Sequence, residues 1–153
     1  MLSANATLSS ATAASPVSVP GGALTSLAVS VVVYRLQRDE LARTLRTLHT
    51  ALAHAPRLAA RLTLIDNSEA AELSEALQQL AAQCGWPGAA VLSGHGNVGY
   101  GAGHNMAIRG ATEAAYLVLN PDVELDLAAI RAGLATLEQP GIVLVGAVGR
   151  DGE

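Results

Sequence analysis

The sequence is poor in aromatic residues, in cysteine and in basic runs. Its 153 residues include no phenylalanine and one tryptophan, and the formal net charge is −4. The chain shows neither a basic run that would neutralise phosphates nor an aromatic platform on which bases would stack. No segment approaches the roughly 20 consecutive apolar residues that a membrane-spanning helix requires. We therefore expect neither a nucleic-acid partner nor a membrane-spanning segment.

The cysteine content and the first residues bear on the compartment. Cys84 is the single cysteine, so an intramolecular disulfide is impossible and a reducing compartment is the simplest assumption. We expect Cys84 to be a small buried hydrophobe near a helix end. Residues 1–26 lack a basic residue and are broken by proline and glycine, unlike a secretory signal, and are predicted to form a disordered tail. Half of the chain is hydrophobic, which suits one globular domain over residues 27–153.

Apolar β-branched segments alternate with helical patterns along this domain. The expected strands span residues 27–34, 61–66, 89–92, 115–119 and 142–145. The expected helices span residues 40–54, the segment after Ser68, residues 103–112 and the segment after Asp126. Asp39 and Asp126 are the expected N-caps of the first and last helix. This order predicts an α/β fold with a mainly parallel sheet and flanking helices.

Polar and glycine-rich segments follow four of the expected strands. They are residues 34–35, 66–67, 94–103 and 120–122. In an open α/β sheet a ligand binds outside the carboxyl ends of the strands, where the strand order reverses. We therefore expect these segments to share one rim of the sheet, as a site assembled from several loops requires.

The glycine-rich loop admits more than one interpretation. Residues 94–99 match G-x-G-x-x-G, the dinucleotide fingerprint, and follow an expected strand. That fingerprint normally occupies the first βα turn, whereas this loop lies in the third. Glycines that only satisfy turns are the more serious alternative. Glycine would also let backbone N–H groups approach a phosphate beside the N-terminus of the next helix.

Two carboxylates at strand ends also have structural alternatives. Asn120, Pro121 and Asp122 could form only a type I turn, although a carboxylate beside a phosphate-binding loop suits Mg²⁺. Asp66 could cap the helix that follows, or accept a hydrogen bond from a base or ribose. The sequence leaves these two roles for Asp66 open.

The four histidines show no metal-site spacing. His49 and His54 belong to the polar side or end of the first helix, and His95 lies in the glycine-rich loop. His104 falls in or near the first turn of the third helix, as a surface or capping residue. If protonated, it could contact a diphosphate. No Ser/His/Asp or Cys/His set is discernible.

Four motifs occur in a distinctive order: residues 29–34 (VSVVVY), 64–68 (LIDNS), 96–105 (GNVGYGAGHN) and 116–123 (YLVLNPDV). This order resembles family 2 glycosyltransferases, and especially their rhamnosyltransferase-like branch. The resemblance covers about residues 28–149, essentially the whole expected domain. It implies the Rossmann-like, nucleotide-sugar-binding half of a GT-A domain.

The resemblance also implies an activity and a site. Such enzymes transfer a sugar from a nucleotide-diphosphate donor, dTDP-rhamnose being one candidate, to an acceptor hydroxyl with inversion. By resemblance, Asp122 would bind Mg²⁺ or Mn²⁺ together with Asn120, which stands where the D-x-D motif has its first aspartate. His104 stands where many relatives have an arginine. The residues implied in donor binding are Tyr34, Asp66, Asn67, Gly96, Asn97, Gly99, Gly103, His104 and Asn105.

The resemblance further implies partners and a location. The acceptor would be a glycan or lipid-linked glycan of a cell-surface polysaccharide. We expect a cytoplasmic protein, with a peripheral position at the inner face of the membrane as an alternative. Family members usually continue for about another hundred residues, which supply the acceptor site and an Asp or Glu general base. We therefore expect a donor-binding half truncated at its C-terminus, with its catalytic base unknown and a homodimer formed through an exposed strand edge.

Two other functions remain open on the sequence. A non-catalytic module that binds a nucleotide or nucleotide sugar would carry the same motifs. An NAD-type Rossmann domain would use the glycine fingerprint instead.

Overall fold

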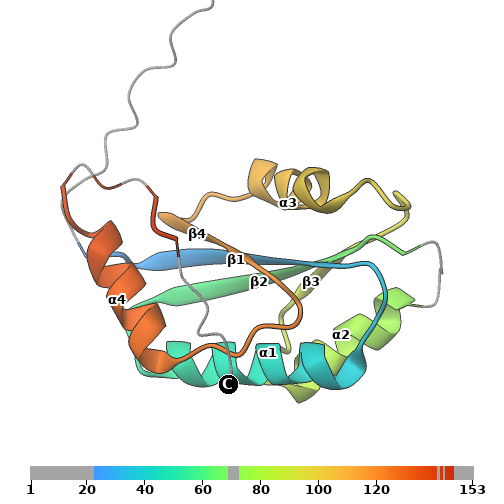
Figure 1. The fold of residues 1–153 in the computed structure, drawn as a ribbon, viewed down its shortest axis with the longest axis horizontal. Coiled ribbons are helices and arrows are strands. Elements are labelled where there is room, and N and C mark those ends of the chain that lie inside the picture. The colour runs from blue at the N-terminus through green and yellow to red at the C-terminus, as the bar shows by residue number, and fades with distance from the viewer. Residues whose placement is uncertain (1–22, 69–72, 141, 143, 147–153) are drawn as a thin grey trace, which may run out of the picture.

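The computed structural model of the protein describes residues 23–68, 73–140, 142 and 144–146. Strands and helices alternate along it (Figure 1). The strands are β1 (Ser26–Val33), β2 (Ala59–Asp66), β3 (Ala90–Leu92) and β4 (Ala115–Leu119). The helices are α1 (Arg38–Ala53), α2 (Leu73–Gln83), α3 (Tyr100–Arg109) and α4 (Leu127–Leu137). The expected α/β class is confirmed, and the predicted tail lies mostly outside the described residues.

The four strands form one parallel sheet in the order β3-β2-β1-β4. In the register of the central strand, Val29 pairs with Leu62 on one side and with Leu117 on the other. Every residue of β1 after Ser26 is buried, as expected for a β-branched strand covered on both faces. Along the chain, β2 is added beside β1 and β3 beside β2. The chain then crosses back over the sheet, so that β4 pairs with the other edge of β1.

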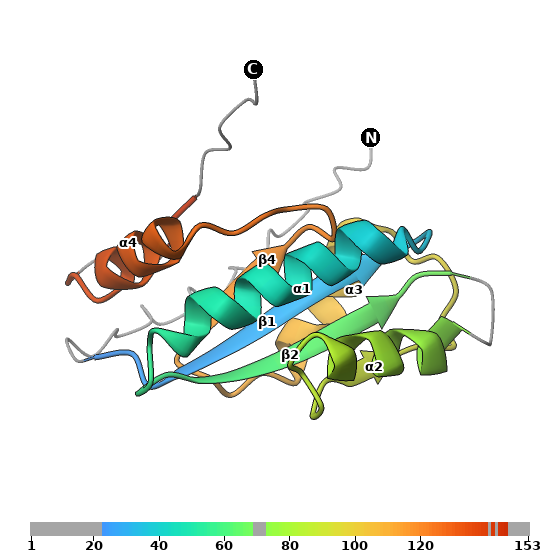
Figure 2. The same ribbon diagram turned by 90° about the horizontal axis from the view of Figure 1, so that it is seen from below.

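This return also decides which face each helix covers. Helices α1 and α2 lie on one face of the sheet and α3 on the other (Figures 1 and 2). Right-handed βαβ crossovers require this, because the step from β3 back to β4 runs opposite to the earlier steps. The larger core lies under α1, whose leucines pack at helical spacing against β1 and β2. Under α3, the buried cluster is only Val32, Ile65 and Ala107.

Helix α4 follows β4 and contacts α1. Asp126 is its N-cap and accepts a hydrogen bond from the Ala128 amide at 2.8 Å, so this predicted cap is confirmed. Two contacts with α1 hold the segment that precedes α4. The Leu125 amide donates to Thr47 Oγ1 at 3.1 Å, and Arg43 forms an ion pair with Glu124 at 3.1 Å. The helix itself buries no residue fully.

Three sequence predictions about these elements are wrong. Residues 142, 144 and 145 are not a strand, and Leu144 is 85% exposed; residue 143 lies outside the described part. The cap of α1 is Gln37, not Asp39, which lies in the first turn. Helix α3 begins at Tyr100, three residues before the expected start, so residues 100–102 are helical as well. The prediction for Cys84 is confirmed, because it is buried directly after α2.

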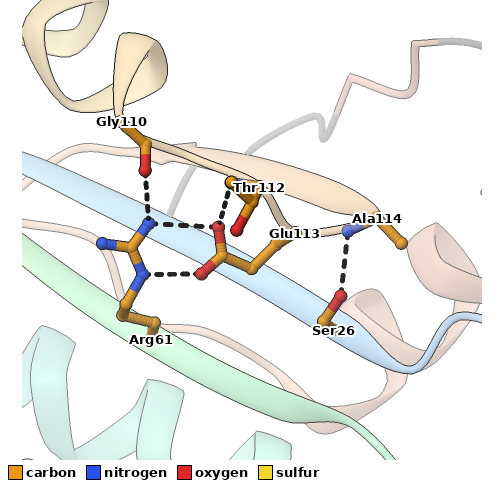
Figure 3. Close-up of polar contacts among 6 residues, drawn as sticks. All are labelled: Ser26, Arg61, Gly110, Thr112, Glu113 and Ala114. Atoms are coloured by element: carbon orange, nitrogen blue, oxygen red, sulfur yellow. Dashed lines mark hydrogen bonds and ion pairs between the residues drawn. The ribbon is translucent and has the colours of Figure 1, made fainter.

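Arg61 fastens the α3–β4 connection to the start of β2 (Figure 3). Its guanidinium binds both carboxylate oxygens of Glu113, at 2.6 and 3.1 Å, and donates to the Gly110 carbonyl at 3.2 Å. Nearby, the Ala114 amide donates to Ser26 Oγ at 2.9 Å. The hydrogen bond from Arg61 is the main cause that lowers the pKa of Glu113 to about 2. These contacts fix β4 beside β1 at the rim opposite the carboxyl ends of the strands.

Within the described residues, no helix combines the length and the apolar character needed to span a membrane.

Candidate functional site

A cleft of about 520 Å³ opens at the carboxyl ends of the strands. It is lined by Val32, Tyr34, Arg35, Asn67, Asn97, Gly99, Tyr100, Asn120, Pro121 and Asp122. These residues come from the ends of β1, β2 and β4 and from the start of α3. All four expected segments thus contribute, at the position where the strand order reverses. A smaller cavity of about 380 Å³, beside His49 and Trp86, lies at the opposite end of the sheet.

Asn67 joins the glycine-rich loop to the sheet. Its side chain is 1% exposed, and its amide nitrogen donates to the Gly99 carbonyl at 3.1 Å and to Asn97 Oδ1 at 3.4 Å. Its backbone N–H donates to the Val33 carbonyl at 2.8 Å. Asn97 Oδ1 also accepts from the Gly99 amide at 3.0 Å. One buried amide side chain therefore sets where the loop passes the ends of β1 and β2.

Gly99, the residue before α3, has a backbone conformation that favours glycine. Its φ is +83°, in the left-handed region that side chains disfavour, and it is the N-cap of the helix. The next residue, Tyr100, already lines the cleft. The first turn of α3 contains no acidic residue. The N-terminus of α3, with its partial positive charge, therefore lies at the cleft wall.

The turn that carries Asp122 is held from two sides. Thr44 of α1 donates to the Pro121 carbonyl at 2.9 Å, and the Tyr100 hydroxyl donates to Asn120 Oδ1 at 2.6 Å. Burial raises the pKa of Tyr100, and the charge of Asp122 raises it further, so the phenol stays protonated. Asp122 itself is exposed on the cleft wall. The strand end and its turn therefore present a fixed carboxylate to a ligand.

Asp66 does not line the cleft, although it ends β2 as predicted. Its carboxylate is 2% exposed and accepts hydrogen bonds from the Ser68 amide at 2.9 Å and from the hydroxyls of Ser68 and Ser74 at 2.5 and 3.3 Å. These bonds tie the end of β2 to α2. They favour the structural alternative, and a contact with a base or ribose stays a prediction.

His104 is not a surface or capping residue, so that expectation is wrong. It lies in the second turn of α3, is 3% exposed, and its Nδ1 lies 2.6 Å from Ser30 Oγ of β1. Its ring also packs edge-on against Tyr100. Burial lowers the pKa of His104, which favours the neutral imidazole. This placement argues against a protonated His104 at a diphosphate.

Gly103 has a packing role under the cleft. A Cβ there would lie 3.0 Å from Val32 Cγ2 and 3.3 Å from Ile65 Cγ2, so α3 approaches the sheet closely enough that a larger residue would push these side chains aside. Gly96 and Asn105 also lie outside the residues that line the cleft, and their predicted roles remain untested. Conversely, Arg35 and Tyr100 fall in segments expected at this rim but were not named as individual site residues. Their positions directly after β1 and beside the helix N-terminus were the available signals.

The comparisons with known proteins agree with this fold. Glycosyl transferase family 2 matches residues 30–153. Two solved structures of TarS from S. aureus share the fold at 16% identity: one has a TM-score of 0.54, and the other, residues 1–349, a TM-score of 0.53. Each covers 74% of this chain, which spans only 19% and 32% of their lengths. A search of curated protein sequences found no match. Because the family match extends over most of the sequence, this chain belongs to glycosyl transferase family 2.

Proposed function

We propose that the cleft binds the donor of a glycosyl transfer, a nucleotide-diphosphate sugar. One observation carries this proposal: four separate segments meet at the carboxyl rim, with a fixed carboxylate on one wall and a helix N-terminus on another. The volume of about 520 Å³ suits part of such a ligand. In this arrangement Tyr34 and Asn67 lie toward the base and ribose, and the α3 N-terminus and Asp122 lie toward the diphosphate. The rhamnosyltransferase-like motifs make dTDP-rhamnose the first donor to test.

The cleft wall fits a divalent cation that arrives with the donor. Within the described residues, no three His, Cys, Asp or Glu side chains gather into a metal site, so the protein alone does not enclose a cation. Mg²⁺ is typically held by one or two carboxylates together with substrate phosphates, and Asp122 supplies one such carboxylate. Asn120 Oδ1 accepts from Tyr100 and has one lone pair left for the cation. A bound Mg²⁺ or Mn²⁺ would neutralise the charge of the leaving diphosphate.

The proposed reaction is a single displacement with inversion. The acceptor hydroxyl oxygen forms a bond to the anomeric carbon while the bond from that carbon to the diphosphate oxygen breaks, and a general base takes the hydroxyl proton. The residues described here bind and orient the donor. Asp122 is the only carboxylate among the residues that line the cleft, and we assign it to the cation. The base and the site for a glycan or lipid-linked glycan are therefore not assigned to the described residues.

The single carboxylate among the residues that line the cleft favours one second candidate, a non-catalytic module that binds a nucleotide sugar. Among the residues that line the described cleft, Asp122 is the only carboxylate, and we assign it to the cation and not to a general base. The two candidates differ in one measurable respect. Sugar transfer by this chain alone would reject the module, whereas metal-dependent nucleotide binding without transfer would favour it.

The donor proposal is tested by nucleotide binding. Calorimetry would compare dTDP and UDP, with and without Mn²⁺, on the wild-type chain, on Asp122→Asn and on Glu124→Gln. Glu124 is the matched control, because it lies two residues further along, pairs with Arg43 and does not line the cleft. We expect Mn²⁺ to increase the affinity of the wild type and of Glu124→Gln about tenfold or more and to leave Asp122→Asn nearly unchanged. Binding of NAD in place of dTDP and UDP, or an undiminished Mn²⁺ effect in Asp122→Asn, would refute the proposal.

A further inference from the structure

The cleft has an unusual shortage of positive charge for a site that receives a diphosphate. Of the residues that line it, Asp122 is the only acidic one and Arg35 the only basic one. A diphosphate brings further negative charge to a wall that already carries a carboxylate. A divalent cation at Asp122 would offset only part of the combined charge of the diphosphate and the carboxylate. The cleft therefore needs a cationic side chain as well.

Four other basic residues of α1, β2 and α3 make contacts away from the cleft. His104 lies in the core against Ser30, and burial favours its neutral form. Arg61 binds Glu113 at the opposite rim, and Arg43 pairs with Glu124 beside α4. Arg38 donates to Gln83 at 3.2 Å, outside the cleft. None of these four side chains lines the cleft.

Arg35 lines the cleft, and its guanidinium is available to bind a ligand there. It follows β1 by two residues, and no hydrogen bond or ion pair joins its guanidinium to another of the residues that the structure describes. Its guanidinium carbon lies 5.4 Å from the centroid of the Tyr34 ring, a cation–π contact that limits the orientations of the side chain. Because β1 and β4 are paired neighbours, Arg35 and Asp122 stand at adjacent strand ends on the same cleft.

We propose that Arg35 binds the diphosphate of the donor in the same cleft as Asp122, which would hold a divalent cation. This inference rests on the proposed function and deepens it, since it names the residue that selects a diphosphate over an uncharged nucleoside. A guanidinium is suited to this task, because its planar set of donors can bind two phosphate oxygens at once. Tyr34 then serves in part to hold Arg35 in place.

The test compares charged and uncharged probes on matched variants. Calorimetry would measure dTDP and thymidine, and in parallel UDP and uridine, on the wild type, Arg35→Gln, Arg35→Lys and Arg38→Gln. Arg38 is the control, because it is an exposed arginine near Arg35 that does not line the cleft. Arg35→Gln should weaken dTDP or UDP binding roughly ten- to a hundredfold and leave nucleoside binding within about twofold. Arg35→Lys should restore part of the loss, since the charge returns without the paired donors.

The outcomes separate this inference from the proposed function. If the wild type binds neither dTDP nor UDP, the proposed function fails and the inference fails with it. If the wild type binds and Arg35→Gln binds equally well, the inference is overturned and the proposed function stands. An equal loss for nucleoside and diphosphate would also overturn it, because Arg35 would then act on the base side. Circular dichroism would confirm that each variant is folded.

Discussion

The close approach of α3 to the sheet can be tested at a single position. In Gly103→Ala, the new methyl group would lie 3.0 Å from Val32 Cγ2 and 3.3 Å from Ile65 Cγ2, both in the small buried cluster under α3. Alanine in place of glycine inside a helix stabilises by roughly 0.5–1 kcal/mol. Overpacking a filled core costs roughly 1–3 kcal/mol. The sum is a free energy of unfolding lowered by up to about 2.5 kcal/mol.

Gly133→Ala is the matched control. Gly133 lies inside α4, and a Cβ there would meet no atom within 4 Å, so only the helix-propensity gain of roughly 0.5–1 kcal/mol applies. Urea denaturation followed by circular dichroism would measure both free energies of unfolding. We expect the two variants to differ by about 1–3 kcal/mol, with Gly103→Ala the less stable. If Gly103→Ala were stabilised as much as Gly133→Ala, the close approach of α3 would not be required by the fold.

Two further predictions concern single hydrogen-bonded groups. Glu113→Gln should lower the free energy of unfolding in a pH-dependent way. The pKa of Glu113 is lowered from 4.5 to about 2, so the ionised side chain stabilises the fold above pH 4.5, and this contribution disappears as the pH falls toward 2. Thermal unfolding of wild type and variant should therefore converge across that range, and a constant difference would contradict the assignment. Tyr100→Phe removes the donor to Asn120 and should weaken Mn²⁺-dependent binding of dTDP several-fold, while metal-free binding changes little. Tyr116→Phe is its control, because Tyr116 does not line the cleft; equal effects in the two variants would reject a specific role for Tyr100.

The sequence predicted well what local pattern controls. Strand β4 was predicted residue for residue, and Asp126 was identified as a cap, because apolar runs and capping residues act within a few positions. The sharing of one rim by four segments followed from the rule for parallel sheets alone. Residues 142–145 have an equally apolar pattern, but a strand also needs a neighbour to pair with, which sequence pattern does not supply.

The errors at the site trace to the start of α3. Gly101 was taken as a loop residue and Gly103 as the first residue of the helix, so the helix was started late and His104 was placed in its first turn. With the start at Tyr100, the same residue falls on the inward face with Gly103 and Ala107. Glycine is unfavourable in an isolated helix, but here it permits contact with Val32 and Ile65. Tertiary packing therefore overrode local propensity.

The central position of β1 also sets an order of assembly. Ser26 of β1 accepts a hydrogen bond from Ala114, which lies 88 positions further along the chain. Because the entropy cost of closing a loop rises with its length, we expect these contacts to form after those between β1 and β2. A folding chain that had joined only β1, β2 and β3 would already carry Tyr34 and Asn67, but not Asp122 beside them. The cleft therefore exists only once the last strand has docked, and a nucleotide that needs both walls can recognise only the finished sheet.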